Sequence, residues 1–330
     1  MVIPTFNAKE MMLCCLQRLD DPAIAQTVVV DDASTDGTSH VLSERFPDVY
    51  IVVLDRHRGL AHALNRGAEV GTAEFVLFLN NDVFPIDGAI SHLCEALRDN
   101  PLAASAGGRL VDPGGERTQD AYQPRALPGL LGLAARLTGI ERAWPRNPWT
   151  GEHLRHPLDA LTTTQTDRQP AGACLLVRRE ALEQVQGWDE GYWFWYEDVD
   201  LSRRLAQIGS ALYVPTAIFE HVGRASTSGW ARHEQHKRLY HGTLRYAEQH
   251  LPRWQQVLLG ALMVIVTIPR IAWLGRRSQS EALSSYRHLL GEGWALAAGR
   301  VPVAAPGGLP VGYRRPERQA VRRARRRYRR

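Results

Sequence analysis

The sequence contains few cysteines and no secretory signal. Its cysteines form neither a CxxC pair nor the regular spacing of a disulfide framework; the four are Cys14, Cys15, Cys94 and Cys174. The N-terminus has no basic segment followed by an apolar run. We therefore expect a protein of the reducing cytoplasm, with the cysteines as small buried apolar residues. The very short first apolar segment, Val2-Ile3, leaves open a start further upstream.

Long apolar runs are also missing. The longest apolar stretch, Val257 to Ile268, is interrupted by Pro269 and Arg270. It is shorter than the roughly 20 residues that cross a bilayer, so no membrane span is expected. Tryptophans and arginines flank it at positions 254, 273, 276 and 277, and such residues are common at membrane interfaces. Two interpretations stay open: a helix lying in the interface, or a helix packed on the protein body.

The first strand is followed by no glycine-rich phosphate loop. No GxGxxG is present there, which excludes a dinucleotide-dependent dehydrogenase. A nucleotidyltransferase of related fold would need a glycine-rich, basic loop at the same place, and Pro4-Thr5-Phe6-Asn7 is not one. These two enzyme classes are therefore disfavoured.

Positive charge is almost entirely arginine and is concentrated at the C-terminus. Lysine accounts for only two of the 40 basic residues. Residues 300–330 hold eleven arginines and one glutamate. The net charge of the whole chain is +5, so the remaining residues, 1–299, have a net charge of −5. Such a run is typical of a disordered tail that binds anionic lipid or nucleic acid. A nucleic-acid-binding module is thus the alternative of another class, but it leaves the acidic body unexplained, and we expect no nucleic acid partner.

Residues 1–110 alternate β-branched runs with amphipathic stretches. This pattern predicts an α/β fold with a mainly parallel sheet and helices on both faces. The expected strands are 27–31, 50–53 and 74–79, and the expected helices are 8–19, 37–46, 60–70 and 86–98. The polar motifs of this half then follow the carboxyl ends of strands, where open α/β sheets place their ligands.

The second half begins with a long stretch rich in proline, glycine and arginine, residues 112–168. It is too long for an ordinary connection, so we expect a functional flap or a variable binding insert, with a short helix near 129–138. Further expected elements are a strand at 173–177 and helices at 179–185, from 197, and at 230–250, 254–275 and 279–298.

The first chemical motif is a buried strand that runs into acids and hydroxyls, Val28 to Gly37. A carboxylate at Asp31 or Asp32 can accept a hydrogen bond from the N3–H of uracil or thymine, or from a ribose hydroxyl. Thr5 and Asn7 would lie beside them and complete a nucleoside pocket. A plain strand-to-helix turn with a capping side chain is the alternative.

The second motif is the apolar strand 75–79, which ends in Asn80-Asn81-Asp82. Diphosphates are bound through hard divalent cations, and these prefer oxygen ligands at a rigid position. Asp82 is therefore the first candidate metal ligand, although Asn-Asn-Asp alone is also a common turn.

The third motif comprises Glu197, Asp198 and Asp200 in the expected first turn of a helix, where the helix dipole favours negative charge. Arg203 and Arg204 are spaced to pair with Asp200. Asp198 is expected to be unpaired and so available as a base for an incoming hydroxyl. The aromatic run at 192–196 before it could stack on sugar C–H groups or belong to the core.

In this order, the motifs resemble glycosyltransferase family 2, and especially its rhamnosyltransferase-like branch. The resemblance spans about residues 1–250; its blocks are Pro4–Asn7, Val30–Thr38, Gly59–Gly67, Leu79–Asp82, Gly172–Arg179, Gly187–Glu190, Tyr196–Leu201 and His221. It implies a Rossmann-like A-type glycosyltransferase fold followed by C-terminal amphipathic helices. Single blocks are weak signals, but their joint order is specific.

The resemblance also implies an inverting transfer from a nucleotide-sugar, assisted by Mg²⁺ or Mn²⁺. Asp198 would be the base, and Asp82 and His221 would hold the metal. Donor nucleotide contacts are expected from Thr5, Asn7, Asp31, Asp32, Asn65 and Asn81, and acceptor contacts from Trp188, Asp189 and Glu197. Asn80-Asn81 replace the first acids of the usual DxD, as in related rhamnosyltransferases, and this departure concerns the metal. Two further departures concern donor contacts: His57 stands where asparagine is frequent, and the first strand is unusually short.

Four regions follow from this interpretation. Residues 1–110 would be the nucleotide-sugar-binding half and 111–250 the acceptor-binding and catalytic half of one domain. Residues 251–300 would be an amphipathic helical region that could associate with membrane, and 301–330 an arginine-rich disordered tail. We expect dTDP-rhamnose as donor, with a UDP-sugar as the alternative. A lipid-linked or polysaccharide acceptor and the anionic inner face of the cell membrane are the expected partners, with the enzyme peripheral to that membrane.

Overall fold

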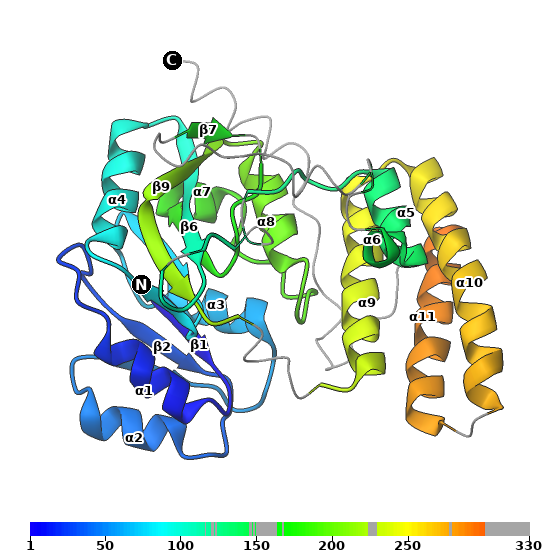
Figure 1. Cartoon of the computed structure of the whole chain (residues 1–330), viewed down its shortest axis with the longest axis horizontal. Helices are drawn as coiled ribbons and strands as arrows, with labels where there is room; N and C mark the ends of the chain where they lie inside the picture. The colour runs from blue at the N-terminus through cyan, green and yellow to red at the C-terminus, as the bar shows by residue number, and fades with distance from the viewer. Residues whose placement is uncertain are drawn as a thin grey trace.

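The structure is a computed structural model, and it describes residues 1–115, 117–119, 122, 124–144, 147, 149, 164–166 (backbone only), 168–223, 230–276 and 279–300. The expected tail, 301–330, and much of the expected insert lie outside these residues. One sheet with helices on both faces forms the part drawn at left in Figure 1, and a group of helices stands beside it at right.

The sheet has nine strands in the order β3-β2-β1-β4-β8-β6-β9-β5, with β7 paired to β9. The pairs β1–β2, β2–β3, β1–β4 and β6–β9 are parallel, and the pairings of β8, β5 and β7 are antiparallel. The strands are β1 Val2–Thr5, β2 Val28–Asp31, β3 Tyr50–Val53, β4 Phe75–Leu79, β5 Val83–Pro85, β6 Ala103–Val111, β7 Thr164–Thr166, β8 Cys174–Arg178 and β9 Ser210–His221.

Helices cover the sheet on both faces, as the sequence pattern predicts. Successive strand residues point to opposite faces, so Ile3 and Val29 pack with α1 (Lys9–Gln17), α2 (Thr38–Arg45) and α4 (Ala89–Asp99). Val2 and Val28 pack on the other face with α3 (Leu60–Ala68), α7 (Arg179–Gln184) and α8 (Glu197–Leu205). Both hydrophobic layers are buried, which fixes the carboxyl ends of β1, β2 and β4 at one edge.

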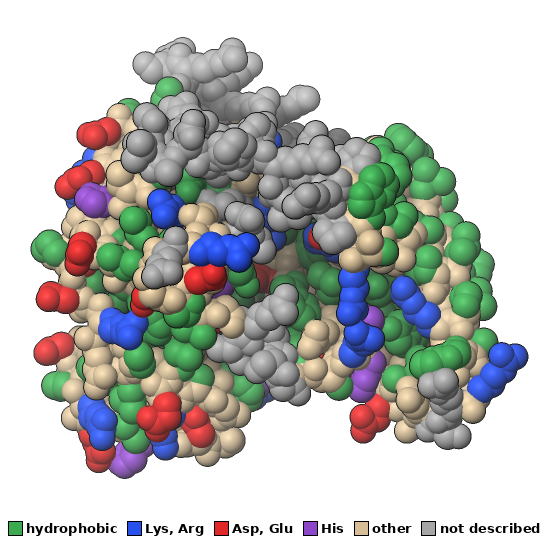
Figure 2. Space-filling view, in the orientation of Figure 1, with side chains coloured by type: hydrophobic (Ala, Val, Ile, Leu, Met, Phe, Trp, Pro, Cys, Tyr) green, Lys and Arg blue, Asp and Glu red, His purple; other side chains and the backbone are tan. Residues whose placement is uncertain are grey.

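A third hydrophobic cluster holds the helical group together. It joins α5, α9, α10 and α11 to the aromatic segment before α8. These helices are α5 Leu130–Thr138, α6 Ile140–Ala143, α9 Arg232–His250, α10 Arg253–Gly275 and α11 Ser280–Ala298. The helices expected at 129–138, 230–250, 254–275 and 279–298 are therefore present. The molecule is hollowed between the sheet and this helical group (Figure 2).

Helix α10 is longer and more apolar than its interrupted apolar run indicated. It continues through Pro269 to Gly275, a length of 23 residues. Among the described helices it is the one that is long and apolar enough to cross a membrane, by length and composition, and 28% of its most apolar window is buried. Proline usually bends a helix but does not always end it. The apolar residues that follow Arg270 extend the run. The expectation that this segment is too short to span a membrane was therefore wrong as regards its length.

Strands β6 and β9 were not predicted, and the residues of each strand explain why. β6 is rich in alanine and glycine, which form strands poorly, and β9 contains Pro215. A Cβ on Gly108 would meet the carbonyl oxygen of Ala217 at 2.4 Å, so only glycine allows the close approach at this irregular part of the β6–β9 pairing.

Candidate active site

Three strands deliver polar side chains to one edge of the sheet. Thr5 ends β1 and lies opposite Asp31, the last residue of β2. Asn81 follows β4, and its Nδ2 donates to Thr5 Oγ1 over 3.4 Å. All three side chains are buried. The structure therefore brings these predicted donor contacts together, as neighbouring parallel strands require.

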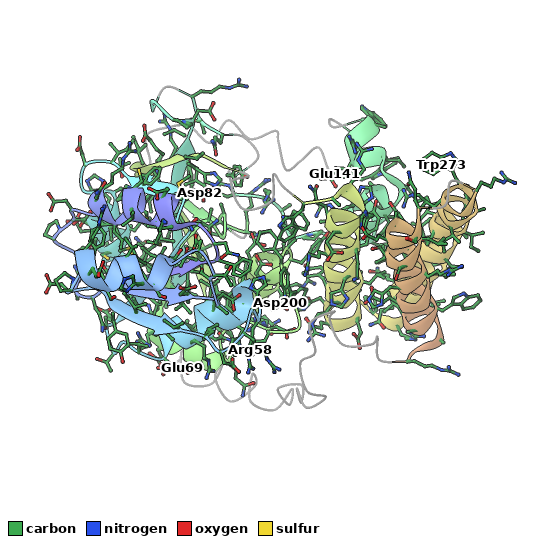
Figure 3. The ribbon with its side chains drawn as sticks, turned by 90° about the horizontal axis from the view of Figure 1, so that it is seen from below. Arg58, Glu69, Asp82, Glu141, Asp200 and Trp273 are labelled. Atoms are coloured by element: carbon green, nitrogen blue, oxygen red, sulfur yellow. The ribbon has the colours of Figure 1, made fainter. Side chains whose placement is uncertain are left out.

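Asp82 and His221 meet although 139 positions separate them in the chain. Strand β5 pairs with β9 so that Val83 lies opposite His221, and Val222 N donates to the carbonyl oxygen of Asp82 over 3.0 Å. His221 Nε2 lies 3.8 Å from Asp82 Oδ1, and both side chains are buried. The two predicted metal ligands are thus adjacent, and Figure 3 shows Asp82 on the sheet side of the molecule.

A glutamine outside the predicted set orients the His221 ring. Gln119 Nε2 donates to the His221 carbonyl oxygen over 2.7 Å and to Asp112 Oδ1 over 2.9 Å, which leaves Gln119 Oε1 facing His221 Nδ1 at 2.8 Å. An amide oxygen only accepts, so Nδ1 carries the proton and Nε2 presents its lone pair to Asp82. Burial lowers the pKa of His221 and favours this neutral form, although the Asp82 charge opposes it.

This arrangement fits a divalent cation. A metal-bound histidine usually donates its other ring N–H to a fixed acceptor, the role that Gln119 has here. The carboxylate of Asp82 and the bare Nε2 of His221 would be the protein ligands. A bound cation would supply charge neutralisation to a diphosphate at this edge.

The neighbouring aspartates Asp31 and Asp32 have different surroundings. Asp32 is fully engaged, because it accepts from Arg58 N, from Gly59 N and from His57 Nδ1 at 2.7–2.8 Å. Asp31 accepts from Ser34 N with Oδ1, while its buried Oδ2 has no hydrogen-bond partner among the described residues. A buried carboxylate oxygen without a partner is costly. Asp31 is therefore the better placed of the two to accept from a ligand.

Asn7 and Asn65 make contacts within the protein. Asn7 Oδ1 accepts from Thr35 N over 2.8 Å and ties the turn after β2 to the end of β1. Asn65 holds the backbone of Trp188 through two bonds of 2.9 Å each. Their predicted contacts with the donor stay predictions, but the structure gives both side chains a positioning role.

Asp198 lies beside the start of β8, which also adjoins the Asp82 motif. Asn80 N donates to the Ala173 carbonyl oxygen over 2.9 Å, and Gly172 N lies 3.4 Å from Asp198 Oδ2. A Cβ on Gly172 would meet the Asp198 Cβ at 2.6 Å, so glycine is needed for this approach. The dipeptide Gly172-Ala173 therefore contacts the Asp198 side chain on one side and the Asn80–Asp82 turn on the other.

Asp198 is not unpaired, and this expectation was wrong. Its Oδ2 accepts from Gln169 Nε2 over 2.7 Å and lies 3.4 Å from Arg125 Nη2. Both partners come from segments before β8, which sequence spacing on the helix cannot place. Gln169 and Arg125 also exchange two backbone hydrogen bonds of 2.8 and 2.9 Å.

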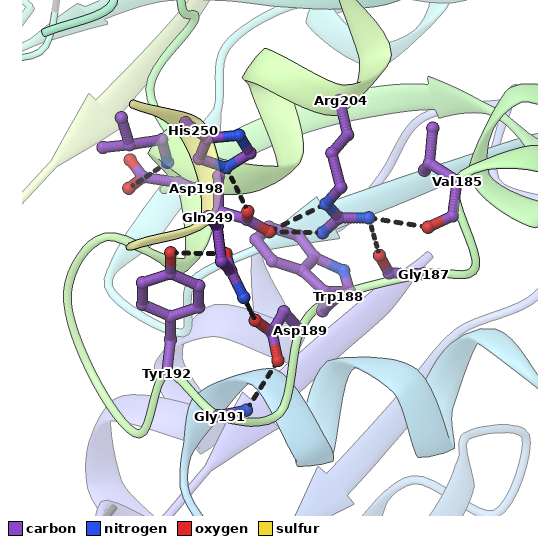
Figure 4. A network of polar contacts seen from close by, with 12 residues as sticks. Val185, Gly187, Trp188, Asp189, Gly191, Tyr192, Asp198, Arg204, Gln249 and His250 are labelled. Carbon is purple, nitrogen blue, oxygen red and sulfur yellow. Dashed lines mark hydrogen bonds and ion pairs between the residues drawn. The ribbon is translucent and has the colours of Figure 1, made fainter. Parts of the chain in front are cut away.

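Glu197 and Asp200 lie on the same helix turn as Asp198 but have different surroundings. Burial, followed by the neighbouring Asp198 charge, raises the pKa of Glu197 and favours its protonated form. Asp200 pairs with Arg204, as predicted, and also with His250 Nε2 over 2.7 Å (Figure 4). The predicted second partner, Arg203, instead donates to the hydroxyl of Tyr246 over 3.2 Å.

Trp188 and Asp189, predicted on the acceptor side, are both buried. Trp188 packs edge-on against Phe78 in the core, with ring centroids 5.0 Å apart. Arg245 donates to both carboxylate oxygens of Asp189. Asp189 also accepts from Gln249 Nε2 over 2.5 Å and from Gly191 N (Figure 4). Burial alone would raise the pKa of Asp189, but Arg245 and these bonds lower it. Both residues therefore have structural roles, and their contacts with the acceptor stay predictions.

The backbone just before Asp198 is strained. Trp195 and Tyr196 have φ angles of +67° and +74°, a region that side chains other than glycine rarely adopt. Successive left-handed residues cost free energy, and such costs are typical of functional sites. Here they turn the chain so that Glu197 and Asp198 begin α8 at the sheet edge.

Sequence reasoning missed Gln119, Arg125 and Gln169. Each is an ordinary polar residue in or next to the stretch expected to be a flap, and none belongs to a repeated spacing. The only signal was the length of that stretch, which indicated a functional segment without naming residues.

Comparisons with known proteins show the family of the chain. The sequence profile of Glycosyl transferase family 2 matches residues 1–186. The chain belongs to this family. It is 34% identical over 250 residues to an N-acetylglucosaminyl-diphospho-decaprenol L-rhamnosyltransferase of Mycobacterium tuberculosis, covering 70% of this chain and 77% of that one. A pre-mycofactocin glycosyltransferase of the same organism is 28% identical over 264 residues, 76% of this chain and 49% of that one.

The fold is that of the A-type glycosyltransferases. A crystal structure of GalNAc-T7 with UDP, GalNAc and Mn²⁺ superposes with a TM-score of 0.53 at 14% identity, covering 75% of this chain and 47% of that chain. This likeness and the family match confirm the predicted fold class, and the protein is a family 2 glycosyltransferase.

Proposed function

We propose that this glycosyltransferase moves a sugar, with inversion, from a nucleotide-diphosphate donor to a lipid-linked or cell-envelope glycan acceptor. Rhamnose from dTDP-rhamnose is the first choice of donor, and a UDP-sugar is the alternative. The relative named as an L-rhamnosyltransferase supports this choice. The main structural support is that Gly172-Ala173, just before β8, contact Asp198 and also Asn80, in the turn whose Asp82 lies beside His221.

In the proposed reaction, Asp198 accepts the proton of the acceptor hydroxyl. The hydroxyl oxygen forms a bond to the anomeric carbon while the bond from that carbon to the donor diphosphate breaks. The electron pair of the broken bond leaves with the diphosphate, which lies toward Asp82 and His221. A single displacement of this kind inverts the anomeric configuration, and a positioned base is its main requirement.

The donor nucleoside would bind at the ends of β1 and β2. The unpartnered Oδ2 of Asp31 offers an acceptor to the N3–H of thymine or uracil. Mg²⁺ or Mn²⁺ would be held by Asp82 and His221, at the diphosphate of the same donor. This places the nucleoside and the diphosphate along one sheet edge.

The acceptor would reach the site from a membrane surface. Helix α10 exposes Trp254, Leu258, Ile265, Ile268 and Trp273, each at least half exposed. Figure 3 shows Trp273 on the outer helix, at the far end of the molecule from the sheet. An apolar stripe of this kind suits the headgroup boundary of a bilayer, and the arginine-rich tail would add attraction to anionic lipid.

The decisive experiment replaces Asp198 by asparagine, which keeps its size but cannot take a proton. We expect Asp198→Asn to reduce transfer at least 10³-fold, within the range for a lost general base. Donor binding should be unchanged, as measured by thermal stabilisation with dTDP-rhamnose and UDP-sugars, with and without Mn²⁺. Transfer at near wild-type rate would remove Asp198 from this role, and stabilisation by a UDP-sugar alone would select the alternative donor.

A further inference from the structure

Arg125 brings a positive charge to the Asp198 carboxylate. Its backbone is fixed by hydrogen bonds, but its side chain makes few contacts. Its backbone N and O both bond to Gln169, at 2.9 and 2.8 Å. Its side chain reaches Asp198 through one contact, Nη2 to Oδ2 at 3.4 Å, and is 30% exposed. The peptide is thus anchored while the guanidinium faces both the carboxylate and solvent.

The Arg125 side chain uses little of its hydrogen-bonding capacity. A guanidinium has five N–H donors and favours paired contacts with carboxylate or phosphate. Here the ion pair is a single long contact, and the buried Nε has no hydrogen-bond partner among the described residues. By contrast, Arg204 and Arg245 make two-nitrogen contacts with Asp200 and Asp189.

Asp198 does not depend on Arg125 for its position. Gln169 Nε2 donates to the same oxygen over 2.7 Å, and Val199 N donates to Oδ1 over 2.9 Å. The other acid facing Arg125 is Glu197, whose burial favours its protonated form. Asp198 is therefore the negative partner of Arg125, and Arg125 can leave it without moving the carboxylate.

We propose that Arg125 binds an acidic group adjoining the acceptor sugar, a diphosphate in lipid-linked acceptors, and in doing so gives up its ion pair with Asp198. The inference rests on the proposed function, because it takes Asp198 as the base and the acceptor as anionic. A diphosphate one sugar ring from the attacking hydroxyl satisfies the guanidinium with two contacts instead of one. Asp198 then faces the hydroxyl without a competing cation. An uncharged acceptor leaves the ion pair intact, so the site selects acceptors by charge.

The test compares two acceptors with the full-length enzyme. One is N-acetylglucosaminyl diphosphate on a short prenyl chain, and the other is the uncharged alkyl glycoside of the same sugar. We expect Arg125→Ala to lower kcat/KM about 100-fold with the diphosphate acceptor and less than threefold with the glycoside. Arg125→Lys, which keeps the charge but not the paired geometry, should give an intermediate loss. Arg142→Ala removes the same charge from an exposed position of α6 and should change neither rate.

Two outcomes would overturn the proposal. Equal losses on both acceptors would show that Arg125 serves Asp198 alone, and weaker binding of dTDP or UDP to Arg125→Ala would assign Arg125 to the donor. Asp198→Asn separates this proposal from the broader one, since it should abolish transfer to either acceptor. If Asp198→Asn fails to do so, the proposed base is wrong, whereas an unaltered charge preference in Arg125→Ala contradicts only the role of Arg125.

Discussion

One amide group determines which nitrogen of His221 faces Asp82. Gln119 donates through Nε2 to two oxygens and accepts from His221 Nδ1, so the proton position follows from a network that spans the segment 112–119 and β9. The sequence indicated His221 only through family resemblance and did not indicate Gln119 at all. Gln119 and His221 are 102 positions apart. They meet because β6 pairs with β9 and Thr118 bridges back to Val111 at the end of β6, and no local spacing encodes that contact.

At this scale we predict that Gln119→Leu weakens metal binding by about 10- to 100-fold, the usual cost of losing the partner of a metal-bound histidine. Gln119→Glu keeps an oxygen at Nδ1 and is the matched control, which should retain most of the affinity. The measurement is the Mn²⁺ concentration that gives half of the maximal thermal stabilisation in the presence of dTDP. Equal values for wild type and Gln119→Leu would show that Gln119 does not orient the ring.

At the scale of elements, α9 and α11 are joined by a buried ion pair. His241 Nδ1 lies 2.5 Å from Glu292 Oε1, and His241 Nε2 lies 3.3 Å from the Gly191 carbonyl oxygen. Burial would lower the pKa of His241, but Glu292 raises it above the usual range; burial would raise the pKa of Glu292, but His241 and His288 lower it to about 2. The pair therefore couples the helical group to the loop before α8.

This pair predicts a window of pH in which it stabilises the fold. Its contribution is present above the ordinary glutamate pKa and below the ordinary histidine pKa, from about 4.5 to 6.5. It declines as the pH falls toward 2, where Glu292 is protonated, and as the pH rises through the raised pKa of His241. We expect Glu292→Gln to cost about 3–5 kcal/mol near pH 5.5, the range for breaking a buried pair. Urea unfolding at pH 3, 5.5 and 9 measures this; a cost independent of pH would refute the assignment, and Glu281→Gln on exposed α11 surface is the control.

Most elements could be predicted, but not their assembly. Strand 75–79 is a continuous apolar run, and α8 has acids in its first turn and arginines in its last; both elements appear where expected. β6 and β9 lacked such signals, because alanine, glycine and proline obscure strands. The candidate site was predicted where residues end strands, as at Asp82 and Asp31. It was not predicted where a residue of the expected insert contacts the start of α8, as Arg125 contacts Asp198.

At the scale of the whole molecule, the proposed donor site lies on the sheet and the proposed membrane contact lies on the helical group. We predict that Ile265→Glu lowers binding to anionic vesicles about tenfold or more, because the side chain is 65% exposed and would lose its apolar contact. Folding should be unaffected. Leu102→Glu, at a 67% exposed position in the sheet-bearing part, is the control and should bind as wild type does.

The measurement is sedimentation with phosphatidylserine vesicles at several salt concentrations. Attraction to the arginine tail should weaken with salt, while the α10 contribution should persist. Equal vesicle binding by wild type and Ile265→Glu would contradict a membrane-facing α10. Binding to DNA with similar affinity would instead indicate that the tail alone drives association.

Helix α9 contacts the segment 189–200, which contains Asp198, at two points, through Arg245 on Asp189 and through His250 on Asp200. Since α9 also packs against α10 and α11, these ion pairs connect the helical group to the segment that carries Asp198. With a bilayer beneath α10, the proposed base Asp198 would lie at a constant distance from the lipid plane. The length of the spacer between the lipid and the sugar would then determine which hydroxyl of the acceptor is glycosylated.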